Sequence, residues 1–217
     1  MFSGFFSESI IKRAIKNGLV KINLYNIRDW AKDKHKTVDD KPYGGGVGMI
    51  MRVDILDRAL SSILPKQKKK KTKIILLSAS GKPFNQKMAQ KLSKIDRLIL
   101  ICGHYEGIDE RIITLIDEEI SIGDYVLTGG ELPAAVVVDT VVRLIPGVVG
   151  KEESLKEESF SKNLLEYPQY TRPEVYKGIK VPKILLSGNH KKIAEWREQQ
   201  ALKITKKRRP DLLKEKE

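Results

Sequence analysis

The sequences KIILLS, at residues 73–78, and RLILIC, at residues 97–102, are short apolar runs without polar alternation. Strands that are apolar on both faces are typical of parallel sheets covered by helices on both sides. A stretch with helical spacing of apolar residues, 85–93, separates the two runs. Together they predict an α/β fold, with a parallel sheet and helices on both of its faces.

Further elements are predicted on either side of these runs. Apolar residues at helical spacing predict helices at 3–17, 53–64 and 131–145. Alternation with polar residues predicts a strand at 20–24. Near the C-terminus we expect an extended piece at 184–186, then a helix from about His190 with Asn189 as its N-cap.

Two segments rich in glycine or small residues, at 79–81 and 103–107, follow the predicted strands, and a third such segment, at 123–130, is expected at the same edge of the sheet. In open parallel sheets, ligands bind beyond the carboxyl ends of the strands. Glycine lets the backbone approach a ligand closely. The sequence therefore predicts a ligand site in these loops.

Charge and cysteine content narrow the class of protein. The formal net charge is +13, and residues 177–217 carry 13 Lys and Arg against 5 Asp and Glu. Such a tail favours a polyanionic partner such as nucleic acid, whereas the lysine block at 66–73 is interpreted as solvated surface. A single cysteine, Cys102, excludes an internal disulfide and suits a reducing compartment.

A membrane partner and a structural metal are not expected. The chain has no run of 18 apolar residues and no basic-then-apolar leader. Three scattered histidines and one thiol argue against a closed zinc site. We therefore expect a cytoplasmic protein with no metal ligands of its own.

The stretch DDKPYGGGVGM, residues 39–49, places four glycines within five positions. A Walker phosphate loop would need Lys-Ser/Thr after its last glycine, but Met49-Ile50 follows Gly48 here. Two interpretations stay open. The stretch is either a tightly turning surface loop or a segment whose backbone contacts a substrate.

Several single side chains each allow a functional and a structural interpretation. Cys102 is a candidate nucleophile, although a buried inert thiol is the simpler interpretation. His104 is either a ligand contact or a plain loop residue. The carboxylates of Glu106, Asp109 and Glu110 are either acid–base groups or helix-start residues.

Several segments, taken in order along nearly the whole chain, resemble bacterial tRNA (guanine-N1)-methyltransferases of the TrmD type, in the SPOUT superfamily. They are HKTVDDKPYGGG at 35–46, GHYEGIDER at 103–111, SIGDYVLTGGELP at 121–133, YTRPE at 170–174 and LLSGNH at 185–190. The segment at 121–133 is the most specific of them.

The resemblance implies a SPOUT-type catalytic domain at 1–150 with a deep trefoil knot, an interdomain linker at 151–160, and a small, mainly helical C-terminal domain at 161–217 that binds tRNA. It implies S-adenosylmethionine (AdoMet) as methyl donor, and a homodimer. The implied reaction methylates N1 of the guanosine immediately 3′ of the anticodon, which prevents frameshifting. General topology rules would not predict the knot.

The chemistry requires a base, because guanine N1 carries a proton at neutral pH. It also needs a group that stabilises charge moving onto O6. By resemblance the base is Glu158, in EESF at 157–160, where the family has aspartate. Arg143 matches the arginine near O6, and Glu106 matches an active-site carboxylate. The resemblance also implies a role for Mg²⁺ in the transfer step.

The resemblance assigns binding residues as well. Those for AdoMet are Leu77, Ser78, Gly103, Tyr105, Ile122, Gly123, Asp124, Tyr125, Val126, Leu127, Gly129, Gly130 and Pro133. Those for the substrate are Asp39, Tyr43, Gly45, Ser154, Asn189 and His190.

The chain departs from the family pattern in places. Val47 stands where proline is usual, which loosens the glycine loop, and His104 often appears as arginine.

The family begins with a strand before the Met-Phe found here as Met1-Phe2. A misassigned start or a truncation would leave an unpaired sheet edge with exposed apolar surface, and we expect poor solubility or weak activity. The alternatives are a catalytically weak RNA-binding relative and a SPOUT methyltransferase that acts on rRNA.

Overall fold

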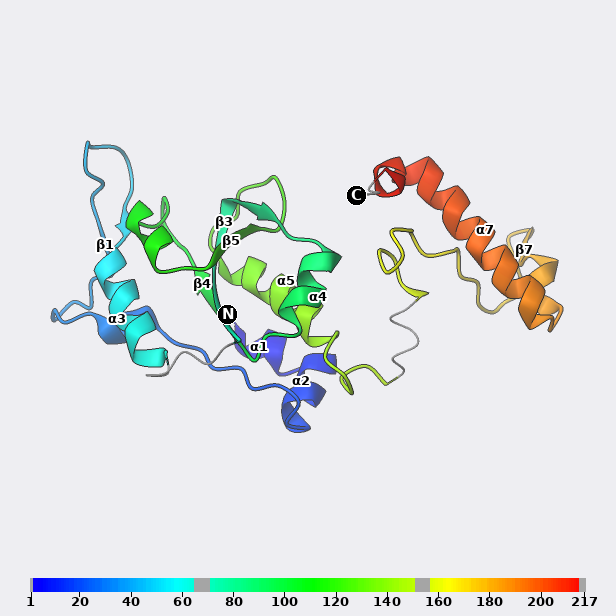
Figure 1. The fold of residues 1–217 in the computed structure, drawn as a ribbon, viewed down its shortest axis with the longest axis horizontal. Coiled ribbons are helices and arrows are strands. Elements are labelled where there is room, and N and C mark those ends of the chain that lie inside the picture. The colour runs from blue at the N-terminus through cyan, green and yellow to red at the C-terminus, as the bar shows by residue number, and fades with distance from the viewer. Residues whose placement is uncertain (1, 65–70, 151–156, 215–217) are drawn as a thin grey trace. The chain divides into compact units, whose positions relative to one another are not determined.

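A computed structural model of the chain describes residues 2–64, 71–150 and 157–214, which belong to two compact units, Met1–Gly150 and Lys151–Glu217 (Figure 1). The first unit contains, in chain order, α1 (Phe2–Phe6), α2 (Ser9–Lys16), the 3-10 helix η1 (Ile27–Trp30), β1 (Asp39–Asp40), β2 (Ile50–Met51), α3 (Val53–Ile63), β3 (Thr72–Pro83), α4 (Gln86–Leu92), β4 (Arg97–Cys102), η2 (Glu110–Thr114), β5 (Glu118–Ser121) and α5 (Glu131–Val142).

The central sheet has the order β4-β3-β5, and both pairings are parallel. The apolar runs at 73–78 and 97–102 lie side by side, from Thr72 opposite Arg97 to Leu77 opposite Cys102. The predicted parallel sheet is therefore confirmed. After Leu77, β3 leaves the ladder and returns, so that Lys82 also lies opposite Ile120 of β5.

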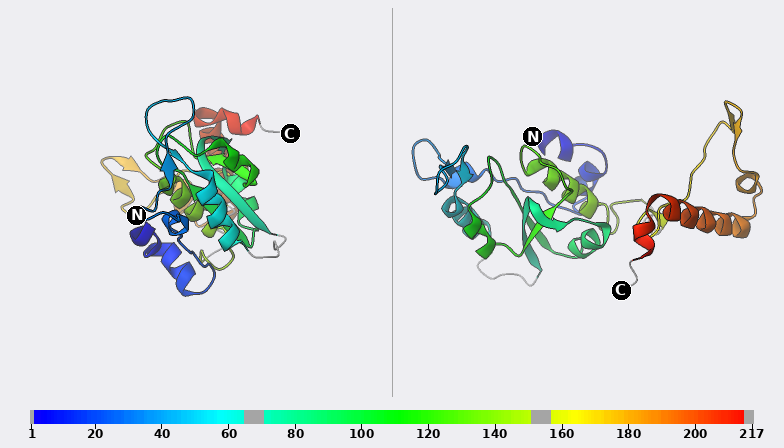
Figure 2. Two further views of the ribbon diagram at one scale, coloured as in Figure 1. Left: turned by 90° about the vertical axis from the view of Figure 1, so that its left-hand side faces the viewer. Right: turned by 90° about the horizontal axis from the view of Figure 1, so that it is seen from above.

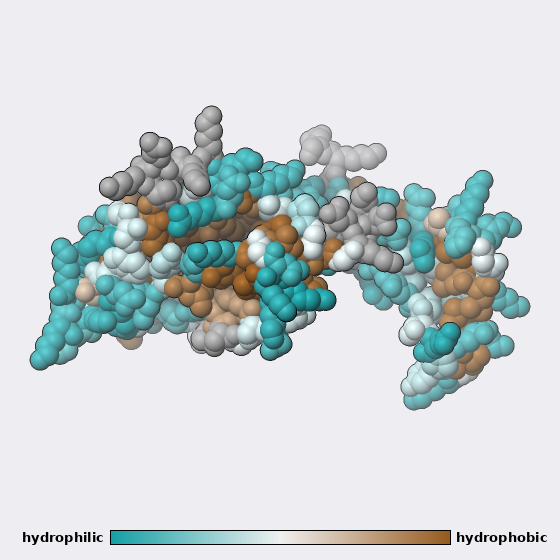
Figure 3. Space-filling view, turned by 90° about the horizontal axis from the view of Figure 1, so that it is seen from below, coloured by the Kyte–Doolittle hydropathy of each residue, from teal (hydrophilic) through white to brown (hydrophobic). Residues whose placement is uncertain are grey.

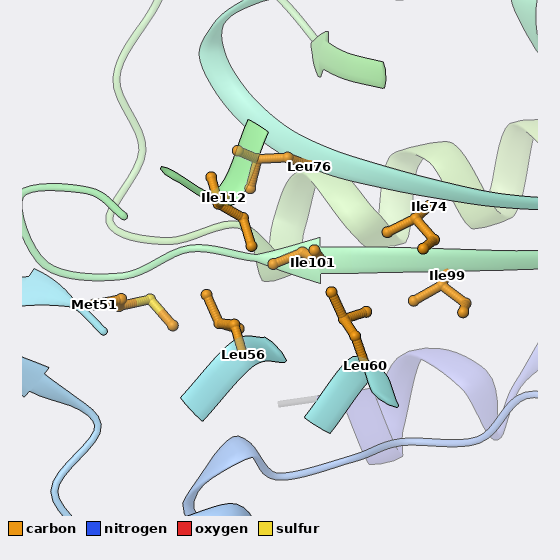
Figure 4. Packing of buried hydrophobic residues seen from close by; sticks show 8 residues of the cluster. All are labelled: Met51, Leu56, Leu60, Ile74, Leu76, Ile99, Ile101 and Ile112. Carbon is orange, nitrogen blue, oxygen red and sulfur yellow. The ribbon is translucent and has the colours of Figure 1, made fainter. Parts of the chain in front are cut away.

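Helices cover both faces of this sheet. On one face, Leu56 and Leu60 of α3 point toward the β4 residues Ile99 and Ile101 (Figure 4). On the other face, residues of α4 and α5 pack on Ile75, Leu77 and Ile120. Leu77 is 5% exposed and Ile120 is 0% exposed. Alternate residues of β3 thus enter opposite cores, which explains why the run at 73–78 has no polar alternation.

Two predictions near the N-terminus are wrong. The helix expected at 3–17 is two helices, α1 and α2, because Ser9 adopts a left-handed φ of 54° at the junction. Gly18, with φ of 70°, ends α2 as predicted. The strand expected at 20–24 does not form, because no other strand in the described part of the chain lies beside it to supply ladder hydrogen bonds.

A large apolar cavity of about 1140 Å³ borders β4 along the edge that β3 does not occupy. Its lining includes Phe2, Leu24 and Leu60 together with the whole of β4. Figure 3 shows apolar residues, in brown, around a hollow of the first unit. Among the described residues, no strand pairs with this edge. An edge of this kind is a site for non-specific association.

The second unit contains the hairpin strands β6 (Val175–Tyr176) and β7 (Ile179–Lys180), the 3-10 helix η3 (Lys183–Leu186), α7 (His190–Arg208) and η4 (Pro210–Leu213). The extended piece expected at 184–186 is therefore wrong, since these residues form η3. Asn189 caps α7 as predicted, its side chain accepting a hydrogen bond of 3.1 Å from the Lys192 N–H. The hairpin, yellow-orange in Figure 2, exposes the side chains of Tyr176 and Ile179.

Buried Thr205 ties α7 to the preceding chain. Its hydroxyl donates to the Ala201 carbonyl at 2.7 Å and accepts from the Leu165 N–H at 2.8 Å. A buried hydroxyl with both hydrogen bonds made fixes the register between the two segments without an unsatisfied polar group.

Candidate functional site

A cavity of about 370 Å³ lies at the carboxyl ends of β3, β4 and β5, where the sheet predicts a ligand site. All three predicted segments contribute to it, although Gly81 itself does not line the cavity. The prediction of a loop at 79–81 is wrong, because these residues continue β3, which runs to Pro83. Of the residues assigned to AdoMet by resemblance, its lining includes Leu77, Ser78, Gly103, Tyr105, Ile122, Gly123, Tyr125, Val126, Leu127, Gly129, Gly130 and Pro133. Asp124 belongs to the same loop but does not line the cavity.

Gly130 brings the start of α5 against the end of β4. Its N–H donates to the Gly103 carbonyl at 2.8 Å. A Cβ at this position would lie 2.6 Å from the Cα of Cys102 and 2.8 Å from the Gly103 nitrogen. Only glycine fits at this contact, which forms one wall of the cavity.

Gly123 begins a compact turn at the end of β5. Its N–H donates to the Ser121 hydroxyl at 3.2 Å, and that hydroxyl donates to the Gly123 carbonyl at 3.1 Å. The Tyr125 hydroxyl donates to the Ile122 carbonyl at 3.3 Å. A Cβ on Gly123 would lie 2.4 Å from the Tyr125 ring, so glycine permits the ring to fold back over the turn.

Three polar contacts of residues that line the cavity could not be predicted from the sequence. His104 Nε2 and Glu131 Oε1 are 2.5 Å apart. The Ser80 hydroxyl donates to Glu119 at 2.9 Å and lies 2.8 Å from the Ser78 hydroxyl. His104 is distant in sequence from Glu131, and Ser80 from Glu119, whereas the two serines are close in sequence. The only signal in the sequence was the location of His104 and Ser80 just after the two predicted strands, although Ser80 belongs to β3 in the structure.

The Asp109 carboxylate is a helix-start residue. It caps η2 by accepting from the Arg111 N–H at 3.0 Å. The hydrogen bond from the Arg111 guanidinium lowers the pKa of Asp109 to about 2, so the carboxylate stays ionised at neutral pH. Of the two interpretations of this carboxylate, the structure favours the structural one.

Cys102 ends β4, and burial raises the pKa of its thiol to about 12, with a smaller contribution from the Glu131 charge. At pH 8 only about one such thiol in ten thousand is ionised, and the thiolate is the reactive form. We therefore expect the native protein to react slowly with a disulfide reagent at pH 8 and the urea-unfolded protein to react at once. Absorbance of the released thiol measures both rates. Equal rates in the two states would contradict the burial argument.

The residues with catalytic assignments are spread over both units. Glu106 lines the cavity. Arg143 caps the C-terminus of α5 and is half-buried. Because α5 has 12 residues and therefore spans about 18 Å, Arg143 lies at the opposite end of the helix from Gly130. Glu158 belongs to the second unit, is half-buried, and its carbonyl accepts from the Ser161 hydroxyl at 2.7 Å.

The residues with substrate assignments are placed as follows. Asp39 lies in β1, opposite Met51 of β2. Tyr43 is fully exposed, and Gly45 has a left-handed φ of 81°, in the glycine loop between β1 and β2. Asn189 and His190 start α7 in the second unit. Ser154 lies outside the described residues.

The glycine loop is attached to the segment 103–109, which follows β4, through backbone hydrogen bonds. The Glu106 N–H donates to the Met49 carbonyl at 3.1 Å, and the Met51 N–H donates to the Gly107 carbonyl at 2.9 Å. Gly48 lies so close to Glu106 that a Cβ would be 2.3 Å from the Cγ of that side chain. The contact sets where the Glu106 carboxylate lies.

We expect Gly48→Ala to displace the Glu106 side chain and to lower the rate of the reaction about tenfold to a hundredfold. Gly44→Ala is the matched control, because Gly44 has φ of 83° against 88° for Gly48 but no atom within 4 Å of its added Cβ. Both variants therefore carry the same backbone strain. Equal kcat/KM values for the two variants would contradict a specific role for the Gly48 contact.

Neither a metal cluster nor a membrane helix occurs in the described ranges. Among residues 2–64, 71–150 and 157–214, no group of three or more His, Cys, Asp or Glu side chains is placed to hold a metal ion. In the same ranges, no helix is both long and apolar enough to cross a membrane.

Comparison with known proteins places the chain in one family. Residues 1–215 match the family described as tRNA (Guanine-1)-methyltransferase TrmD. A tRNA (guanine-N(1)-)-methyltransferase of Dictyoglomus turgidum is 59% identical over 213 residues, which cover 98% of this chain and 85% of the relative. The enzyme of the same name from Moorella thermoacetica is 56% identical over 98% of this chain and 86% of its own. That from Clostridioides difficile is 54% identical over 99% and 93%. With its cavity at the strand ends and this similarity over nearly its whole length, the chain belongs to the TrmD family of tRNA (guanine-1)-methyltransferases.

Proposed function

We propose that the protein transfers a methyl group from AdoMet to N1 of the guanosine immediately 3′ of the tRNA anticodon, and so prevents frameshifting. The observation that carries the proposal is the identity of 54–59% to relatives named tRNA (guanine-N(1)-)-methyltransferase, over 98–99% of the chain.

The cavity at the strand ends fits AdoMet. Its volume of about 370 Å³ lies within the range of small-molecule sites, about 300–1,000 Å³. Leu77, Ile122 and Pro133 offer apolar contacts, and the glycine-rich loops offer backbone N–H and C=O groups. When bound there, AdoMet supplies a methyl group already activated by its sulfonium.

The chain's own residues then act on the guanine. In this proposal the Glu158 carboxylate accepts the N1 proton, which makes N1 nucleophilic. The Arg143 guanidinium stabilises the charge that moves onto O6. Glu106, held beneath the glycine loop by Gly48, supplies a further carboxylate at the cavity. The implied Mg²⁺ has no cluster of three ligands among the described residues, so no residue is assigned to it.

We further propose a SPOUT-type catalytic domain at 1–150 with a trefoil knot, a linker at 151–160 and a tRNA-binding domain at 161–217. The basic last turn of α7, with Lys206, Lys207 and Arg208, supports binding of a polyanion. The location of Arg143 at the far end of α5 from the cavity supports a homodimer, because a second copy offers a route for this residue to a cavity. We propose a cytoplasmic location, where the tRNA substrate lies.

Transfer of tritiated methyl to an unmodified tRNA transcript with guanosine after the anticodon tests the proposal. We expect the label on N1 of that guanosine and none on a transcript with adenosine at that position. AdoMet binding without transfer would identify a catalytically weak RNA-binding relative instead. Transfer to rRNA and not to tRNA would identify a different SPOUT substrate.

A further inference from the structure

Arg28 is a half-buried residue of η1, and its backbone is fixed at both ends of that element. The Asn26 side chain accepts from the Arg28 N–H at 3.1 Å and so caps η1. At the other end, the Arg58 guanidinium of α3 donates to the Trp30 carbonyl at 3.1 Å. η1 is therefore attached to the helix that covers one face of the sheet.

The Arg28 guanidinium joins two loops that are distant in sequence. One nitrogen, Nη1, donates to the Lys36 carbonyl at 2.9 Å. The other, Nη2, donates to the Tyr105 hydroxyl at 3.1 Å. The two donors of a guanidinium are fixed in one plane, so the two acceptors are held at a set separation.

The segment that begins at Lys36 is itself well ordered at its start. The Thr37 hydroxyl donates to the Asp33 carboxylate at 2.7 Å, and the Thr37 N–H donates to the same group at 3.1 Å. Lys36 adopts a left-handed φ of 52°, which turns the chain toward β1. The contact from Arg28 therefore determines where the approach to the glycine loop begins.

The far end of the same segment is also attached to loop 103–109, through the backbone bonds of Met49 and Met51 with Glu106 and Gly107. Segment 36–51 is thus anchored on loop 103–109 at both ends. Between the anchors, Tyr43 is 100% exposed and Val47 is 94% exposed. A change in loop 103–109 must move both ends of the exposed loop together.

We propose that Arg28 is a positioning residue that couples cofactor binding to tRNA binding. This rests on the function proposed above, in which the cofactor lies against Tyr105 and tRNA against Tyr43. Cofactor that orders loop 103–107 fixes the Tyr105 hydroxyl, the guanidinium transmits this to Lys36, and the glycine loop is ordered before tRNA arrives. Such coupling is reciprocal, so tRNA raises cofactor affinity by the same factor.

The test measures the Kd of unmodified tRNA with and without saturating S-adenosylhomocysteine, the stable product of the cofactor. We expect the wild-type protein to bind tRNA about tenfold more tightly with S-adenosylhomocysteine present. Arg28→Ala and Arg28→Lys should both lower this ratio to about one, because an ammonium cannot reproduce the fixed two-donor bridge. Arg13→Ala, which removes the same charge from an exposed position on α2, should leave the ratio unchanged.

A direct phosphate contact by Arg28 predicts different results. In that case Arg28→Lys keeps the ratio, while Arg28→Ala weakens tRNA binding equally with and without S-adenosylhomocysteine and lowers the salt slope by about one. Either result would overturn the proposal, as would a wild-type ratio of one. If Arg28→Ala does not fold, Arg28→Lys carries the test alone.

A double variant tests the bridge itself. Tyr105→Phe removes the hydroxyl that accepts from Arg28, so we expect Arg28→Ala and the double variant to show the same ratio. If the effects of the two substitutions on this ratio multiplied, the proposed bridge would be overturned. Methyl transfer by the wild-type protein is measured in parallel. If the wild-type protein methylates N1 but shows no coupling, only the role of Arg28 is contradicted. Absent methylation contradicts the proposed function.

Discussion

Glu158→Gln is expected to lower kcat for methyl transfer about a thousandfold, the size of effect typical for loss of a general base. Glutamine keeps the shape of glutamate but cannot accept the N1 proton. Two hydrogen bonds in the turn that holds Glu158 do not use its carboxylate and should survive. The Glu158 carbonyl accepts from the Ser161 hydroxyl, and the Ser159 hydroxyl accepts from the Glu166 N–H at 3.0 Å. AdoMet binding should therefore be unchanged.

The neighbouring carboxylate supplies the matched control. Glu157 accepts from the Tyr167 hydroxyl at 3.0 Å and lies 4.0 Å from the Arg197 guanidinium, on an exposed surface. Glu157→Gln should change the single-turnover rate by no more than about threefold, as expected for an exposed ion pair. Loss of transfer in Glu157→Gln alone would move the base to that residue. Unchanged turnover in Glu158→Gln would remove Glu158 from the mechanism.

Replacement of Glu158 by aspartate, the residue of the family pattern, tests the length of the side chain rather than its charge. Glu158→Asp keeps a carboxylate one methylene shorter. If the surrounding chain of this protein has adapted to the longer side chain, we expect Glu158→Asp to be about tenfold slower than the wild type. A faster Glu158→Asp variant would show that the glutamate limits the natural rate. The pre-steady-state rate at saturating tRNA and AdoMet measures the difference.

The parallel sheet was predictable because β3 and β4 contribute apolar residues to two cores at once. No polar residue can then interrupt the run without entering one of those cores. β5 gave no such signal, since its four residues begin with Glu118 and Glu119, which lie at the half-buried margin. The strand expected at 20–24 has the right alternation, but a strand also needs a neighbour, and no local pattern encodes one.

The site was predictable to the level of loops. A parallel sheet brings the carboxyl ends of its strands together, so the segments after the apolar runs 73–78 and 97–102 were expected to share one cavity, and both line it together with the loop after β5. Side-chain partners within it were not predictable, because Arg28 and Tyr105 are 77 positions apart and their meeting depends on how η1 packs on α3. The role proposed for Glu158 likewise rests on resemblance alone, since a carboxylate in a charged segment normally faces solvent.

Gly130→Ala is expected to abolish measurable AdoMet binding and to lower the free energy of unfolding by about 1–3 kcal/mol, the usual cost of overpacking. The added methyl would overlap backbone atoms, namely the Cα of Cys102 at 2.6 Å and the Gly103 nitrogen at 2.8 Å. A backbone contact cannot be relieved by a change of rotamer. Either α5 or the chain at Cys102 and Gly103 must move, and both Pro133 of α5 and Gly103 line the cavity.

The effect is steric and does not arise from backbone strain. Gly130 has φ of −78° and ψ of −4°, which alanine adopts readily. In exposed helices, alanine is in fact more favourable than glycine by about 1 kcal/mol. Gly4→Ala therefore serves as the control, because Gly4 is an exposed residue of α1 with no atom within 4 Å of its added Cβ.

Calorimetric titration with AdoMet and urea unfolding measure the two consequences separately. We expect Gly4→Ala to bind as the wild type does and to unfold at an equal or higher urea concentration. Gly130→Ala should unfold earlier with an unchanged m-value, because the same surface is exposed on unfolding. A Gly130→Ala variant that keeps wild-type affinity would show that the start of α5 and the end of β4 can separate without altering the cavity. The cofactor would then depend on residues 76–80 of β3 and on the loop after β5, and not on this contact.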